Sequence, residues 1–195
     1  MAEKFDPRNW DKLENPDRLV ELPPSALIGL LDLTGAETVV DYGAGTGLFS
    51  LPVAEALLHG TLVAVDEHEE LLERLRSKAP DALAAGRVRT VQTADNHVPL
   101  PDGAADRVLM VNVLHHVHDE PAALAEVFRL LAPGGRVVSV DYAQMDRPVG
   151  PPNDHVLSLQ AARAVLSDAG FTELAVYHPG EVGRYSIAIV AEKAG

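Results

Sequence analysis

The pattern of hydrophobic and polar positions changes along this chain, with segments of strand type followed by segments of helix type. Short β-branched apolar runs are typical of buried strands, whereas apolar residues spaced three and four positions apart are typical of helices. Strands are predicted at residues 38–42, 61–66, 87–92, 105–112, 136–142, 172–178 and 185–191. Helices are predicted at residues 23–33, 47–58, 68–78, 119–131 and 158–170, and Pro52 indicates a bend or a late start in the second of these.

Alternating strands and helices predict a parallel sheet covered on both faces, because parallel neighbours need long crossover connections. The last two predicted strands are joined by only about six residues, so we expect them to pair antiparallel. The expected fold class is α/β: a doubly wound, seven-stranded, mostly parallel sheet with helices on both faces and a C-terminal antiparallel strand. We expect residues 1–22 to form an N-terminal arm or lid and residues 23–195 to form one Rossmann-like domain.

Composition narrows the class of protein. The 195-residue chain has a net charge of −13 and no cysteine. The charge argues against nucleic-acid binding, which needs Lys and Arg, and the missing thiols exclude disulfides and cysteine-ligated metals. Residues 1–12 are charged, and no apolar run is long enough to cross a bilayer, so we expect no membrane insertion and a cytoplasmic protein.

The most informative stretch is 39–47, V-V-D-Y-G-A-G-T-G, in which Gly43, Gly45 and Gly47 alternate directly after a predicted strand. A strand, a glycine loop and a helix form the nucleotide-binding corner of a doubly wound sheet. Asp66 ends the next strand, where an acid accepts hydrogen bonds from ribose hydroxyls in more than one cofactor class. A dinucleotide fingerprint needs G-x-G-x-x-G, and this chain has Leu48 and no third glycine at that spacing.

Four further blocks follow in order. They are V-A-V-D at 63–66 with E-E-L-L at 69–72, A-D-N-H-V-P-L-P-D-G at 94–103 with A-D-R-V at 105–108, L-H-H-V at 114–117, and L-L-A-P-G-G at 130–135. With these blocks, residues 25–192 resemble the Rossmann-like S-adenosylmethionine-dependent methyltransferases, especially the small-molecule group that includes the ubiquinone/menaquinone-biosynthesis type. The resemblance implies S-adenosylmethionine as cofactor and S-adenosylhomocysteine as its product.

The resemblance also implies a role for residues after the first and fourth strands. Gly43, Gly45 and Gly47 would let the backbone pack against the methionine half of the cofactor, and Asp41 would lie near its ammonium group. Asn112 and Val113 would line the pocket near the sulfonium. Carboxylates suit a cofactor that carries two positive charges.

The adenosine half is assigned by the same resemblance. Asp66 would bind the ribose hydroxyls, with Glu67 beside the adenine. Asp95 would accept a hydrogen bond from the adenine amino group, with Asn96 next to it.

Methyl transfer from a sulfonium needs alignment above all, and a general base only where the acceptor must lose a proton. His115, His116 and His118 follow the fourth strand, and His116 is the preferred base candidate, since imidazole titrates near neutral pH. Tyr142, at the end of the fifth strand, is the second catalytic candidate. For both residues the alternative to catalysis is a purely structural role, in capping, hydrogen bonding or packing.

A metal site formed by the three histidines and Asp119 is disfavoured, because adjacent strand residues point to opposite faces. The family resembled here usually works without metal, so we predict none.

We therefore expect a methyltransferase that acts on a small organic molecule, at oxygen, nitrogen or carbon. Two alternatives stay open: an NAD(P)-dependent oxidoreductase, and a non-catalytic cofactor-binding protein with the same fold.

Overall fold

The computed structural model describes residues 5–117 and 119–195. Within them the strands are β1 Thr38–Tyr42, β2 Thr61–Asp66, β3 Val88–Gln92, β4 Ala105–Val111, β5 Leu131–Tyr142, β6 Thr172–Tyr177 and β7 Ser186–Glu192. The helices are α1 Trp10–Leu13, α2 Asp17–Glu21, α3 Pro24–Leu31, α4 Ser50–Ala56, α5 Glu69–Lys78, α6 Pro80–Ala84, α7 Glu120–Leu130 and α8 Leu159–Asp168. Short 3-10 turns lie at Pro7–Asn9, Leu114–His116 and Asn153–His155.

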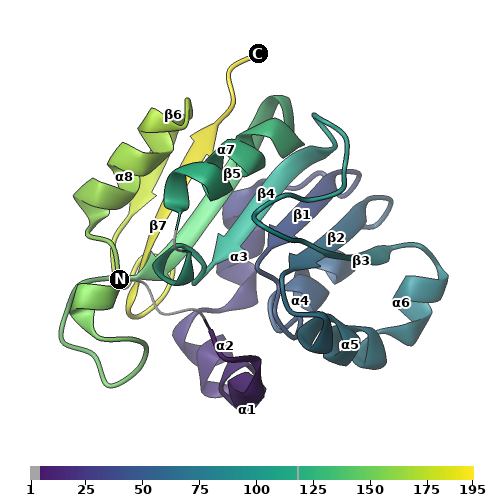
Figure 1. Ribbon diagram of the computed structural model, residues 1–195, viewed down its shortest axis with the longest axis horizontal. Coiled ribbons are helices and arrows are strands. Elements are labelled where there is room, and N and C mark those ends of the chain that lie inside the picture. The colour runs from purple at the N-terminus through teal and green to yellow at the C-terminus, as the bar shows by residue number, and fades with distance from the viewer. Residues whose placement is uncertain (1–4, 118) are drawn as a thin grey trace.

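The strands of this part of the chain form one seven-stranded sheet in the order β3-β2-β1-β4-β5-β7-β6 (Figure 1). Strands β1 to β5 are parallel, and β7 runs antiparallel to both β5 and β6. The expected fold class is confirmed, including the antiparallel pairing of the last two strands. The chain order reverses between β1 and β4, which is the switch point at which doubly wound sheets bind ligands.

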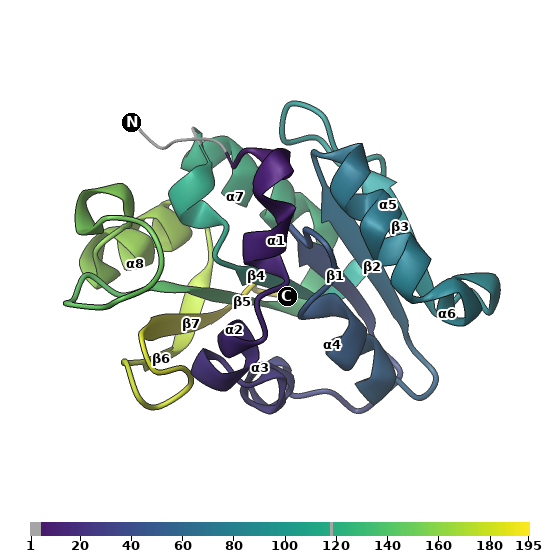
Figure 2. The same cartoon turned by 90° about the horizontal axis from the view of Figure 1, so that it is seen from below.

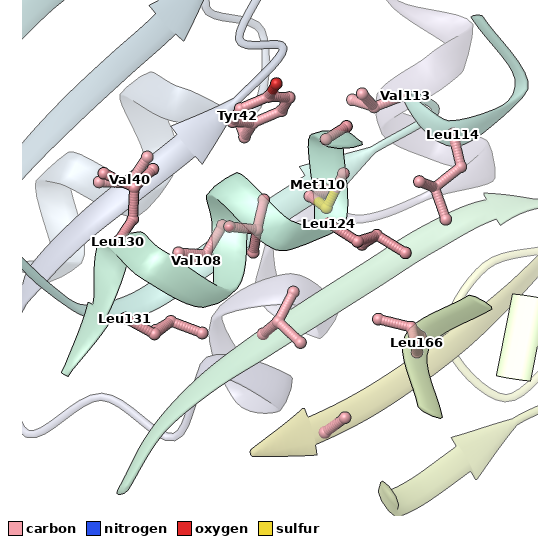
Figure 3. Close-up of a cluster of buried hydrophobic side chains, with 14 of the residues drawn as sticks. Val40, Tyr42, Val108, Met110, Val113, Leu114, Leu124, Leu130, Leu131 and Leu166 are labelled. Atoms are coloured by element: carbon pink, nitrogen blue, oxygen red, sulfur yellow. The ribbon is translucent and has the colours of Figure 1, made fainter. Parts of the chain in front are cut away.

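Consecutive strand residues feed two separate hydrophobic cores, because side chains alternate between the faces of a sheet. In β1, Val40 belongs to the core that includes residues of α7 and α8, whereas Val39 belongs to the core that includes residues of α3, α4 and α5. Figure 3 shows the first core, in which Leu124 and Leu130 of α7 pack over the strands. Both faces are therefore covered, and this leaves the edge at which the parallel strands end as the place for a site.

One predicted helix starts late and one short helix was not predicted, each for an identifiable reason. The helix predicted at 47–58 begins at Ser50, because the glycine loop continues through Gly47 at φ +83°. Pro52 therefore lies in the first turn of α4, where its missing N–H breaks no hydrogen bond of the helix. Of the two predicted effects of Pro52, a bend or a late start, the late start is observed. Pro80 begins α6, a short helix that the sequence analysis did not predict.

The N-terminal arm folds back over the edge at which the parallel strands end. Figure 2 looks onto this edge and shows α1 lying in front of it. Glu14 pairs with Lys78 of α5 at 2.5 Å, and the Arg74 guanidinium lies 3.4 Å from the centroid of the Trp10 ring. At its other end the arm accepts a hydrogen bond at the Glu21 carbonyl from the Arg184 amide, at 2.7 Å. The arm is therefore attached to this edge near both of its ends. None of the described helices is both long and apolar enough to span a bilayer.

Candidate functional site

Polar side chains gather where four neighbouring parallel strands end. Asp41 lies near the end of β1, Asp66 ends β2, Asn112 follows β4 and Asp141 lies near the end of β5. The first three are predicted site residues, and Asp141 is not. Parallel strands β2, β1, β4 and β5 are consecutive in the sheet, so these residues share one edge.

The glycines of the loop after β1 are required by contact as well as by conformation. All three have positive φ, between 54° and 83°. A Cβ on Gly43 would lie 2.5 Å from Val113 Cγ2, and one on Gly47 would lie 2.7 Å from Leu75 Cγ. Only glycine lets the loop approach the end of β4 and helix α5 this closely.

Gly43→Ala therefore tests the loop. Its positive φ and the contact with Val113 should together lower the free energy of unfolding by about 2–4 kcal/mol. The matched control is Gly86→Ala, which has φ +70° and open space around the new methyl group, and should cost only about 1–2 kcal/mol. Thermal unfolding of the two variants measures the difference. Equal losses would mean that the contact with Val113 does not constrain the loop.

Asp66 links the glycine loop to the start of the next helix. Its Oδ2 accepts a hydrogen bond from the Gly45 amide at 2.8 Å, and its Oδ1 accepts one from the His68 amide at 2.9 Å. The His68 ring lies against the same oxygen, and this contact raises the pKa of His68. A carboxylate has about four acceptor positions, and these three contacts leave one for a ligand hydroxyl; a second becomes available when the His68 ring turns away.

Asp41 is the most buried carboxyl group of the site. Its Oδ2 accepts a hydrogen bond from Ser50 Oγ at 2.5 Å. Burial raises the pKa of Asp41 to about 7, and the neighbouring charge of Asp66 acts in the same direction. Asp41 is therefore poised to ionise when a positive group binds beside it.

The predicted adenine-side residues lie in a tight turn beyond β3. The backbones of Ala94 and His97 pair with each other, which leaves Asp95 and Asn96 at the tip, both with positive φ. The Tyr42 hydroxyl lies 3.5 Å from Asn96 Oδ1, which ties this turn to the end of β1. Asp95 and Glu67 are exposed.

Two buried oxygens at this edge have no hydrogen-bond partner in the described part of the chain. They are Thr46 Oγ1 in the glycine loop and Asn112 Oδ1, and Asn112 has a positive φ of 58°. Buried polar atoms are almost always paired, so unpaired ones indicate a missing polar ligand. Together with the close-packed glycines and the two aspartates, they fit a polar nucleoside that carries positive charge.

The histidines after β4 differ in their surroundings. His115 is buried, and its Nδ1 lies 2.6 Å from Asp141 Oδ1. Asp141 Oδ1 also accepts a hydrogen bond from the Tyr142 amide at 2.7 Å. The His116 ring lies 4.0 Å from that of His115 and contacts Phe5 of the arm edge-on. The best-positioned imidazole is therefore His115, to which the sequence analysis gave less weight than to His116.

The remaining candidates of this region have other positions. Asp119 caps α7 by accepting a hydrogen bond from the Ala122 amide at 3.0 Å. His118 lies outside the described residues. In residues 5–117 and 119–195 no three His, Asp or Glu side chains come together as a metal site would require.

Tyr142 is flanked by cations. The Arg147 guanidinium lies 4.9 Å from its ring centroid, and Arg18 of α2 interacts with its side chain. Its ring centroid lies 6.1 Å from that of His115. The second catalytic candidate therefore does share a neighbourhood with the histidines.

Fold and site together define a doubly wound nucleotide-binding protein whose glycine loop differs from the dinucleotide type. A family model described as a methyltransferase domain matches residues 40–139, just over half of the chain. The chain belongs to this methyltransferase family, whose cofactor is S-adenosylmethionine, as the sequence resemblance implied.

Two individual relatives of the chain are also named as methyltransferases. The chain is 39% identical over 115 residues to an uncharacterized methyltransferase of Mycobacterium bovis, which covers 59% of this chain and 43% of that protein. It is 30% identical over 125 residues to the ubiquinone/menaquinone biosynthesis C-methyltransferase UbiE of Syntrophotalea carbinolica, covering 64% and 52%. The chain thus spans about half the length of these curated relatives.

Among solved structures, a SAM-dependent methyltransferase from Aquifex aeolicus matches with a TM-score of 0.89 and 28% identity. The match covers 97% of this chain and 99% of that one. These comparisons support the methyltransferase interpretation and give no support to the oxidoreductase alternative.

Proposed function

We propose that this protein transfers a methyl group from S-adenosylmethionine to a small organic acceptor. One observation carries the proposal: a close-packed glycine loop, tied by Gly45 to the carboxylate that ends β2, lies at the switch point of the sheet. The bound cofactor supplies an activated methyl group on a sulfonium. The protein then has to align the acceptor, exclude water and, where needed, accept a proton.

We assign the adenosine half of the cofactor to residues after β2 and β3. Asp66 binds the two ribose hydroxyls while it holds the loop, and the exposed Glu67 borders the adenine. Asp95 and Asn96 flank the far side of the adenine in their turn. Support for this half comes from the contact between Asn96 and Tyr42, which brings the turn to the end of β1.

The methionine half lies over the glycines. Gly43, Gly45 and Gly47 let the backbone approach it, and Asp41 faces its ammonium group. Asn112 and Val113 border the sulfonium. The unpaired Asn112 Oδ1 supports this role, since it is an acceptor without a donor.

Where the acceptor must lose a proton, His115 is the base. Its Nδ1–H donates to Asp141, which fixes the ring and leaves Nε2 as the acceptor. We assign His116 and Tyr142, the original candidates, to the wall of the acceptor pocket. Support for this comes from their ring contacts with His115.

Residues 1–22 act as a lid in this proposal. The arm is held by the ion pair between Glu14 and Lys78 and by the stacking of Arg74 on Trp10. It covers the site and excludes water once the ligands are bound. The net charge of −13 supports a small-molecule acceptor rather than a nucleic acid. We place the reaction in the cytoplasm, because S-adenosylmethionine is a cytosolic metabolite.

A thermal-shift titration tests the cofactor class. S-adenosylhomocysteine should raise the melting temperature and NAD should not, since a ligand that binds only the folded state stabilises it. Methyl transfer to a panel of small phenols, amines and quinols then separates an enzyme from a non-catalytic binding protein. Stabilisation by NAD alone would contradict the proposal.

The raised pKa of Asp41 predicts a pH dependence. The folded protein holds a proton that the unfolded chain releases, so the stability contribution of Asp41 falls as pH rises from about 4 to about 7. If the ammonium binds the ionised carboxylate, affinity for S-adenosylhomocysteine should instead rise about tenfold from pH 6 to pH 8. Calorimetric titration measures this slope. The slope should be lost in Asp41→Asn; if it persists there, another group such as His68 is responsible.

A further inference from the structure

Two arginines that the proposed cofactor site does not use meet at Tyr142. Arg147 comes from the loop after β5 and stacks on the Tyr142 ring. Arg18 comes from α2, in the N-terminal arm, and lies 5.3 Å from the centroid of the Phe49 ring, next to the glycine loop. Burial raises the pKa of Tyr142, and both guanidinium groups counteract that effect, as expected for cations close to a phenol. Segments far apart in the sequence thus bring two positive charges to one side chain.

Neither arginine forms an ion pair with a carboxylate of residues 5–117 or 119–195. Arg18 Nη1 donates to the Leu13 carbonyl at 2.8 Å, and Arg147 donates to the carbonyls of Val149 and Ala143 at 2.6 and 3.2 Å. Two carboxylates, Glu21 and Asp141, also act on Tyr142. Asp141 is already bonded to His115.

Arg147 Nη2 is buried and has no hydrogen-bond partner in the described part of the chain. Donors of a buried guanidinium are normally satisfied, and a planar oxyanion satisfies them best because it can accept two parallel hydrogen bonds. Arg18 and Arg147 are both half-buried and reach the same side chain from different segments, and Glu21 acts on Arg18 without forming an ion pair with it. They form the kind of site that an anionic ligand would complete.

We propose that the methyl acceptor carries a carboxylate, which binds Arg147 and Arg18 beside Tyr142. The inference rests on the proposed function and names the class of acceptor for the same site. Because the Tyr142 and His115 rings are neighbours, an acceptor anchored here has its reacting end within reach of the proposed base. The two arginines are positioning residues for the substrate.

The test uses the full chain saturated with S-adenosylhomocysteine and matched pairs of probes: benzoate and benzamide, 4-hydroxybenzoate and 4-hydroxybenzamide, phenylacetate and phenylacetamide. Inorganic phosphate serves as a control, because it is an anion that is not planar. Ligand-observed NMR gives the affinities. At least one carboxylate should bind about tenfold more tightly than its amide and more tightly than phosphate.

The preference should be lost in Arg147→Met and in Arg18→Met and be partly kept in Arg147→Lys. Arg163→Met is the matched control, because Arg163 pairs with Glu173 on the surface of α8 and β6; it should retain the preference. Equal binding of acid and amide in every pair, no binding of any probe, phosphate binding as tight as carboxylate binding, or a preference that survives both methionine variants would overturn the inference.

Affinity for S-adenosylhomocysteine is measured on the same samples. If the wild-type chain does not bind it, the proposed function fails. If it binds but no carboxylate is preferred, only the inference about the acceptor fails. Unchanged affinity in the arginine variants also shows that they are folded.

Discussion

Asp66→Ala should weaken the binding of S-adenosylhomocysteine more than any other single change at the site. In the proposed complex the variant loses the charge-assisted hydrogen bonds to the ribose, and it also loses the acceptor that holds the Gly45 amide. A cost of about 3 kcal/mol corresponds to a loss of affinity of more than about a hundredfold. Isothermal titration calorimetry measures it directly.

Asp106→Ala is the matched control for Asp66→Ala. Asp106 also accepts a backbone hydrogen bond, from the Thr38 amide at 2.8 Å, but at the opposite end of β1. Its loss should lower the melting temperature and leave the affinity unchanged. If Asp66→Ala binds S-adenosylhomocysteine as tightly as Asp106→Ala does, the assignment of the ribose to β2 is wrong.

His115→Ala should reduce turnover by about 10²- to 10⁴-fold on any acceptor that must lose a proton. Affinity for S-adenosylhomocysteine should stay unchanged, because the His115 ring is held by Asp141 and its proposed role is toward the acceptor. Asp141→Asn should reduce turnover as well, since the amide cannot hold the imidazole in the same way. Steady-state kinetics with a methylated acceptor from the panel measures both variants.

His116→Ala is the comparison for His115→Ala. Its ring contacts Phe5 and the His115 ring, and in the proposal it lines the acceptor pocket, so the variant should lose far less activity. A larger loss in His116→Ala than in His115→Ala would return the role of base to His116. Full turnover in both variants would mean that the reaction needs neither imidazole.

The architecture could be predicted because each element carries its own local signal. Strands β1 and β2 have the predicted bounds, since β-branched runs are closed by an acid or a glycine. Ser158, the first residue of the helix predicted at 158–170, caps α8 by accepting a hydrogen bond from the Ala161 amide at 3.1 Å. The start of α4 could not be read from periodicity, because it depends on how long the backbone keeps positive φ after β1.

The partner of His115 could not be predicted in the same way. Asp141 is 26 residues further along the chain, and it reaches His115 because β4 and β5 pair with Val111 beside Val140. A search for acids at the end of each predicted strand would have found it. The position of the N-terminal arm depends on single contacts, such as Leu13 against the glycine loop, and no periodic pattern encodes these.

The central claim is that the crevice above β1 and β2 binds S-adenosylmethionine through Asp66 and the glycine loop. A crystal structure of the full chain with S-adenosylhomocysteine tests this most directly. The account predicts both ribose hydroxyls on the Asp66 carboxylate and the amino-acid half over Gly43 to Gly47. A nucleoside bound elsewhere, or a crevice that takes up the pyrophosphate of NAD instead, would contradict it.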